Sequence, residues 1–116
     1  MLVAYSVVGQ DEDSQVDGRF GRCPFFALVD DEGDSRIEFI ANAGANAATG
    51  AGVGAAQQLL ELGVAVVVTG QIGPKAFEIF TAAGIPVYLA PASLSLAEAR
   101  KSWCSGNLVC YQIQRF

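Results

Sequence analysis

Two arginines and one cysteine, Arg19, Arg22 and Cys23, lie within a stretch of five residues in an acidic chain. Arg22 beside Cys23 is expected to lower the pKa of the thiol, and a thiolate is a ligand for soft metals. Arg19 offers a guanidinium whose planar N–H donors suit an anionic ligand. A structural interpretation is equally open, in which both arginines pair with Asp13, Asp17 or solvent and Cys23 is a small loop hydrophobe.

Two glycine-rich turns, at residues 49–54 and 69–74, are the second candidate for chemistry. Each stands between an expected strand and an expected helix. In open α/β sheets, ligands bind beyond the carboxyl ends of parallel strands, where helix N-termini offer free N–H groups to an anion. Two such turns side by side predict one anion-binding cleft. Because residues 44–56 are mostly glycine and alanine, close helix packing and loop flexibility explain the pattern equally well.

Several common chemistries are excluded by what the sequence lacks. There is no histidine, so Ser/His/Asp and Cys/His catalysis are impossible, and a zinc site would need carboxylates beside three scattered thiolates. The turn at residues 50–54 lacks the G-x-G-x-x-G spacing of dinucleotide-binding proteins, and no Gly-Lys-Ser/Thr follows it. We therefore expect a protein that is not an enzyme.

The length of 116 residues suits a single domain, 1–116. Seven Lys and Arg residues against twelve Asp and Glu give a formal net charge of -5, which predicts repulsion from nucleic acids and from anionic membranes. No apolar stretch approaches the ~18 residues of a membrane span, and no basic segment precedes the first apolar run. We expect a cytoplasmic protein.

The cysteines do not form a disulfide framework. Cys23, Cys104 and Cys110 are odd in number, and none belongs to a C-x-x-C motif. Cys104 and Cys110 are expected to be buried filler rather than metal ligands.

The elements that must position these residues follow from periodicity. Residues 2–8, 25–29 and 36–41 are predicted strands, with a hairpin turn at residues 30–34, so this half is expected to be antiparallel. The rhythm then changes to helices at residues 51–62 and 74–83 that alternate with strands at residues 64–68 and 86–89. This alternation predicts a parallel β-α-β arrangement.

The predicted helices carry explicit end signals. Gly63 and Gly84 stand where C′ glycines end a helix, and Pro74 suits the first helical position. A third helix begins near Ser95, which forms a capping box with Glu98, and runs to about residue 103. Residues 108–113 are left open between a final edge strand and an extended tail.

Several segments together resemble the dinitrogenase iron-molybdenum cofactor biosynthesis family. The segments are Phe20-Gly21-Arg22, the pair Phe25-Phe26, Asn42 at a strand end, residues 50–54, residues 69–73 with Ala76-Phe77, and residues 84–88. Each motif alone is unspecific, but their order and spacing cover nearly the whole chain. The resemblance implies an α/β, ribonuclease H-like fold with a mixed five-stranded sheet and three helices.

The resemblance also implies a function and a set of site residues. Family members are similar in binding or carrying anionic metal-sulfur clusters, of the iron-molybdenum or molybdenum-copper sulfide type, for cofactor assembly or storage. Cluster donor and acceptor proteins are the implied partners. The cluster-binding residues are then Arg19, Phe20, Gly21, Arg22, Asn42, Gly50, Gly52, Gly54, Thr69, Gly70, Gln71, Ile72 and Gly73, with Cys23 as the candidate metal ligand.

One departure from the family pattern affects the expected mode of binding. Many members carry His-Phe-Gly-Arg, and this chain has Arg19 where the histidine would stand. A charged arginine does not ligate a metal, so we expect a preassembled cluster held by electrostatics and N–H donors. Two other functions stay open: an apo protein-interaction or regulatory module, and a nuclease of the same fold. The strand at residues 2–8 lacks the acidic residues that a two-metal nuclease needs.

Overall fold

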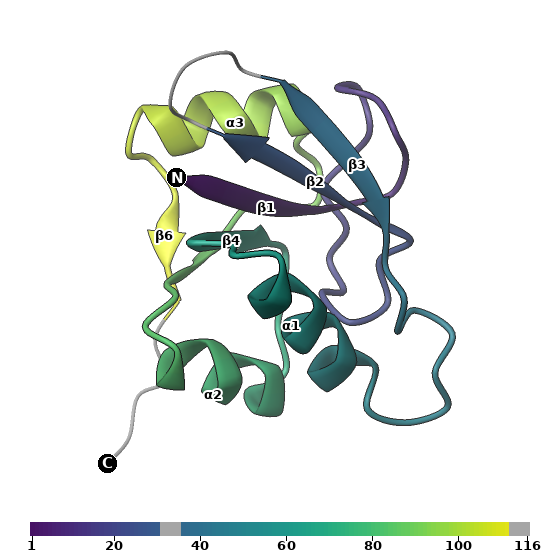
Figure 1. Ribbon diagram of the computed structural model, residues 1–116. Helices are drawn as coiled ribbons and strands as arrows, with labels where there is room; N and C mark the ends of the chain where they lie inside the picture. The colour runs from purple at the N-terminus through teal and green to yellow at the C-terminus, as the bar shows by residue number, and fades with distance from the viewer. Residues whose placement is uncertain (31–35, 112–116) are drawn as a thin grey trace.

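The computed structural model describes residues 1–30 and 36–111, and its centre is a mixed sheet in the order β3-β2-β1-β4-β5-β6 (Figure 1). The strands are β1 (Leu2–Val7), β2 (Phe25–Asp30), β3 (Ile37–Ala41), β4 (Val66–Thr69), β5 (Val87–Leu89) and β6 (Val109–Cys110). Strand β1 pairs antiparallel with β2 and parallel with β4. The pairs β2–β3 and β5–β6 are antiparallel, whereas β4–β5 is parallel.

The mixed α/β layout expected from the sequence is confirmed, but the count of five strands is wrong. A sixth strand, β6, has two residues and pairs with β5. It lies within residues 108–113, which the sequence left open between an edge strand and an extended tail. The predicted turn at residues 30–34, beyond Asp30, and residues 112–113 of the predicted final segment lie outside the described residues.

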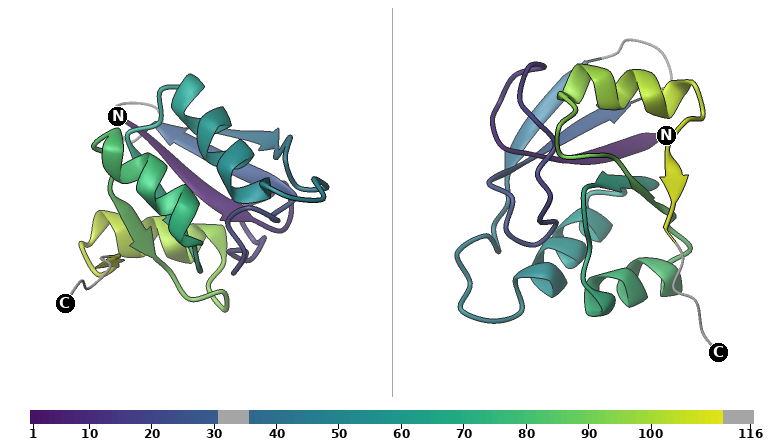
Figure 2. Two further views of the ribbon diagram at one scale, coloured as in Figure 1. Left: turned by 90° about the horizontal axis from the view of Figure 1, so that it is seen from below. Right: turned by 180° about the vertical axis from the view of Figure 1, so that it is seen from behind.

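Three helices, α1 (Ala51–Glu61), α2 (Pro74–Ala82) and α3 (Leu96–Cys104), cover the sheet. Helices α1 and α2 pack on one face and α3 on the other (Figure 2). Successive strand residues point to opposite faces. Accordingly, Ala4 of β1 joins the core under α1 and α2, while Val3 and Tyr5 join the core under α3. The central strand is therefore buried on both sides.

The helix ends follow the signals in the sequence. Gly63 and Gly84 have φ of 77° and 74°, as a C′ glycine requires after α1 and α2. The capping box of α3 is present, because the Glu98 N–H donates to Ser95 Oγ (3.1 Å) and the Ser95 N–H donates to Glu98 Oε1 (3.0 Å). Within the described ranges, 1–30 and 36–111, no helix is both long enough and apolar enough to cross a membrane.

Candidate functional site

A cavity of ≈ 620 Å³ lies where the loop between β1 and β2 meets the N-termini of α1 and α2. Its walls are residues 18–22, 50–53 and 71–76. Nine of the residues expected from the sequence line it: Arg19, Phe20, Gly21, Arg22, Gly50, Gly52, Gln71, Ile72 and Gly73. The two glycine-rich turns and the arginine-containing loop, far apart in the sequence, therefore form one site.

Both helix N-termini at the cavity lack a side-chain cap. The N-cap residues are Gly50 for α1 and Gly73 for α2, and neither has a side chain that could accept a first-turn N–H. First-turn N–H groups have no partner inside the helix and carry the positive end of the helix dipole. Pro74 removes one of these donors from α2. The remaining donors favour an anion as the ligand.

The charged residues that line the cavity are all cationic. They are Arg19, Arg22 and Lys75, three of the seven Lys and Arg residues in the chain. No carboxylate is among the lining residues, although the chain has a formal net charge of -5. The cavity is thus a local cationic region on an acidic protein.

Lys75 was missed by the sequence reasoning, although the sequence held a signal for it. A lysine in the first turn of a helix is repelled by the helix dipole. Helix α3 follows the favourable rule, with Glu98 in its first turn and Lys101 in its last. Helix α2 has no acid in its first turn and places Lys75 there instead. A nearby anionic ligand would account for this reversal.

Arg19 pairs with Asp17, as the structural interpretation of the sequence allowed. Its Nε lies 3.2 Å from Asp17 Oδ1, and its Nη2 donates to Asp17 Oδ2 at 3.3 Å. The hydrogen bond and the charge of Asp17 raise the pKa of Arg19 above its ordinary value. The Arg19 side chain is 69% exposed, whereas that of Asp17 is 4% exposed. A mostly exposed guanidinium is therefore held by a buried carboxylate.

Arg22 has different partners. Its Nη1 donates to the carbonyl oxygen of Ala45 (3.1 Å) and to that of Ala47. Within residues 1–30 and 36–111, no carboxylate lies within ion-pair distance of Arg22. Of the expected partners Asp13, Asp17 or solvent, the two acids are therefore wrong for Arg22, while its side chain is exposed to solvent. Arg22 both lines the cavity and holds the loop that leads to α1.

Asn42 was expected at the ligand but does not line the cavity. It is 6% exposed, and its Nδ2 donates to the carbonyl oxygens of Gly21 (3.0 Å) and Cys23 (2.9 Å). Its Oδ1 accepts the Gly44 N–H at 3.1 Å. Asn42 therefore joins the arginine-containing loop to the end of β3 and shapes the site from behind.

Three further residues expected at the ligand also lie outside the cavity wall: Gly54, Thr69 and Gly70. Thr69 is fully buried, and its Oγ1 lies 2.7 Å from Ser6 Oγ. A Cβ at Gly70 would stand 2.6 Å from Gly18 Cα, so the absent side chain lets the two loops meet. A Cβ at Gly54 would meet no atom within 4 Å.

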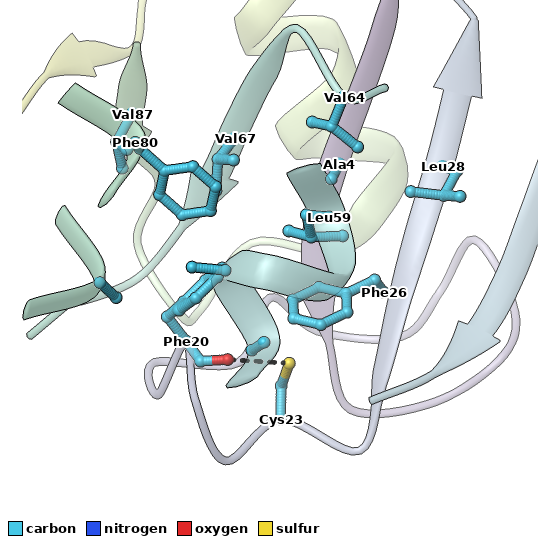
Figure 3. Packing of buried hydrophobic residues seen from close by; sticks show 13 residues of the cluster. Ala4, Phe20, Cys23, Phe26, Leu28, Leu59, Val64, Val67, Phe80 and Val87 are labelled. Atoms are coloured by element: carbon cyan, nitrogen blue, oxygen red, sulfur yellow. Dashed lines mark hydrogen bonds between the residues drawn. The ribbon is translucent and has the colours of Figure 1, made fainter. Parts of the chain in front are cut away.

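The expected activation of Cys23 is wrong. The side chain is fully buried among residues such as Phe20 and Phe26, and its Sγ–H donates to the Phe20 carbonyl oxygen at 3.3 Å (Figure 3). Burial, and next the charge of Asp17, raise the pKa of the Cys23 thiol to about 12. Cys23 does not line the cavity and keeps its proton, so its role is packing. Cys104 and Cys110, expected to be buried, are exposed.

We expect two of the three cysteines to react quickly with a disulfide reagent such as Ellman's reagent at pH 8. Cys104 and Cys110 are exposed, while burial and the raised pKa keep the thiolate of Cys23 scarce. All three should react in denaturant. A fast reaction of Cys23 in the native protein, located by mass spectrometry, would contradict its assignment to the core.

The sheet, the three helices and the cavity define a small α/β protein, ribonuclease H-like in fold, with a cationic site beside two helix N-termini. The family described as "Dinitrogenase iron-molybdenum cofactor" matches residues 1–106. The chain belongs to this family.

Similar proteins agree with this assignment. The apo form of the orange protein from Desulfovibrio gigas has a TM-score of 0.89 and 35% identity, covering 95% of this chain and 92% of that one. A Thermotoga protein named as a candidate NifB protein has a TM-score of 0.83 and 31% identity, covering 98% and 97%. An uncharacterized protein of Methanocaldococcus jannaschii is 32% identical, covering 84% of this chain and 83% of its own length. The family, together with the likeness to the orange protein and the Thermotoga protein, relates the chain to cofactor binding or carrying.

Proposed function

We propose that this protein binds or carries an anionic metal-sulfur cluster, of the iron-molybdenum or molybdenum-copper sulfide type, for cofactor assembly or storage. One observation carries the proposal: a single cavity is bordered by two uncapped helix N-termini and three cationic side chains, and no acid lines it. Sulfide clusters of this kind are anionic, and backbone N–H groups and cations are the donors that recognise them.

The lining residues fit a cluster that arrives already assembled. None of them is a cysteine, histidine, methionine or carboxylate, the side chains that bind metals directly. In the part of the chain that the structure describes, no three His, Cys, Asp or Glu residues are grouped to hold a metal ion. Apolar walls such as Phe20, Val53 and Ile72 suit the weakly hydrated sulfur faces. Carriage of this kind needs a donor and an acceptor protein and no catalysis.

The test is reconstitution without oxygen. The full-length protein is offered thiomolybdate with copper, and separately an iron-sulfide donor, and bound metals and the visible spectrum are measured together. Stoichiometric metal with charge-transfer bands is the expected result and would identify the metals. A colourless, metal-free protein with both donors would contradict the proposal and favour an apo interaction module.

Replacing Lys75 by glutamine should weaken binding of the thiomolybdate-copper cluster about tenfold at low salt, since one favourable charge at the cavity is lost. The side chain is exposed in the first turn of α2, so folding should be unaffected. Lys101→Gln is the matched control, because Lys101 is exposed in the last turn of α3 and does not line the cavity. Equal weakening in both variants would mean that only net charge matters.

A further inference from the structure

Asp17 is the one buried residue with a charged side chain in the part of the chain that the structure describes. Its carboxylate accepts three N–H groups from a single residue, Arg19: the main-chain N–H (2.9 Å), Nε (3.2 Å) and Nη2 (3.3 Å). Burying a carboxylate is costly unless its oxygens are hydrogen-bonded. The arrangement therefore ties the position of Arg19 to that of Asp17.

The main chain of Asp17 is fixed in turn by two central strands. Its N–H donates to the Ser6 carbonyl oxygen at 2.9 Å, at the end of β1. Its own carbonyl oxygen accepts the Gly70 N–H at 3.3 Å, directly after β4, and lies 3.0 Å from Ser6 Oγ. The carboxylate is thus anchored to the rigid part of the sheet rather than to a free loop.

Among residues 1–30 and 36–111, only Asp17 accepts hydrogen bonds from the Arg19 side chain, so the guanidinium retains donors. A guanidinium has five N–H donors, and the bonds to Asp17 use the Nε–H and one Nη2–H. Of the other three, one on Nη2 and one on Nη1 share the outer edge of the planar guanidinium, and the second Nη1–H points back toward Cδ. Because Arg19 lines the cavity and is 69% exposed, this edge is available to a ligand.

We propose that Asp17 is a positioning residue, which holds Arg19 so that the N–H donors on the outer edge of its guanidinium are presented to the anion in the cavity. This inference rests on the proposed function of the cavity. The buried partner makes the arginine a fixed hydrogen-bond donor rather than a mobile charge.

The charges of the site separate this role from a simple electrostatic one. A site built only for attraction would leave Arg19 without an acidic partner, as Arg22 is left among the residues that the structure describes. The negative charge of Asp17 lowers the positive potential of the cavity, which disfavours an anion. A favourable contribution of Asp17 to anion binding is therefore geometric. Loss of the Asp17 charge is therefore expected to weaken anion binding, whereas a net-charge effect would strengthen it.

The experiment measures affinity for the thiomolybdate-copper cluster in the full-length wild-type protein and in Asp17→Asn, Arg19→Lys, Arg19→Ala and the double variant Asp17→Asn/Arg19→Ala. Asp17→Asn and Arg19→Lys should each weaken binding about tenfold, although neither makes the site more negative. The Asp17→Asn change should have no further effect in the Arg19→Ala background, since Asp17 acts through Arg19. Unchanged or tighter binding by Asp17→Asn, or wild-type affinity in Arg19→Lys, would overturn the inference.

A ligand-free measurement separates this inference from the proposed function. The Arg19 Hε proton, observed by NMR, should exchange slowly with water in the wild type and quickly in Asp17→Asn. Fast exchange in the wild type would overturn the positioning role even if the cluster binds. If Asp17→Asn does not fold, Arg19→Lys decides, because that side chain is mostly exposed. Failure of the wild type to bind any cluster, with slow Hε exchange, would count against the proposed function alone.

Discussion

The Gly21→Ala variant is expected to lose about 2 kcal/mol of unfolding free energy and most of its cluster binding. A Cβ at residue 21 would lie 2.6 Å from Gly52 N, 2.7 Å from Gly52 Cα and 3.1 Å from Ala51 C. These atoms are the backbone of the first turn of α1, so no flexible side chain can move aside. Either the loop or the helix N-terminus must shift, and both form the cavity wall. Thermal unfolding and metal reconstitution measure the two effects.

Gly54→Ala is the matched control for this prediction. Gly54 lies in α1 two residues after Gly52, but a Cβ there would meet nothing within 4 Å. Alanine is favoured over glycine inside a helix by about 1 kcal/mol, so this variant should be more stable and should still bind the cluster. Wild-type stability of Gly21→Ala would show that the two segments do not meet as closely as described.

The elements that the sequence predicted well are specified by neighbouring residues. Gly63 and Gly84 end their helices through their own backbone conformation, and Ser95 caps α3 through Glu98, three residues away. Such signals act within a few residues and do not depend on the tertiary structure. The helices and strands in the second half of the chain, where the two alternate, could therefore be predicted from the sequence. The two-residue strand β6 is too short for a periodic pattern and pairs only because β5 leaves an edge beside it.

The sequence predicted which backbone segments meet at the site, but it predicted less well which side chains face the cavity. The two glycine-rich turns come together because β3 and β4, the strands that precede them, end at the same edge of the sheet. Strand β3 runs antiparallel to β2, β2 runs antiparallel to β1, and β1 is parallel to β4, so β3 and β4 point the same way. Whether a side chain faces the cavity or the core depends on distant contacts that no local pattern encodes. Cys23 illustrates this, because its thiol is buried by the packing around Phe20 and Phe26 rather than activated by Arg22. Lys75 illustrates the reverse case: the sequence has an unfavourable lysine in the first turn of a helix, but only the fold places it at the cavity.

Some residues that were expected to contact the ligand instead support the cavity wall from outside. Five of the fifteen residues that line the cavity are glycines, whose polar groups are all in the backbone, and backbone N–H donors bind a ligand well only if their direction is fixed. Gly70 permits the close approach of Gly18, and the Thr69 hydroxyl accepts a hydrogen bond from the Ser6 hydroxyl. These residues therefore support the geometry of the cavity without lining it.

Asn42→Ala is expected to lower the unfolding free energy by about 3 kcal/mol, close to a 10 °C fall in the melting temperature. The change removes the hydrogen bonds to the Gly21 and Cys23 carbonyl oxygens and from the Gly44 N–H, together with the longer one from Nδ2 to Cys23 Sγ at 3.8 Å. The lost partners are buried or partly buried, so water does not fully replace them. Asn42→Asp should be more harmful, because a carboxylate would face two carbonyl oxygens with no N–H to donate. Calorimetry of the three proteins gives the order of stability.

Asn46→Ala is the control, since Asn46 is exposed on the same connection and makes no side-chain hydrogen bond to residues 1–30 or 36–111. Its melting temperature should stay within about 2 °C of the wild type, because exposed substitutions away from special features change stability little.

Cluster binding separates the positioning role of Asn42 from direct contact. If Asn42 only holds the loop, a folded Asn42 variant should release the cluster faster without changing its absorption bands. A shift of the bands with unchanged stability would instead place Asn42 at the ligand and contradict its position behind the wall.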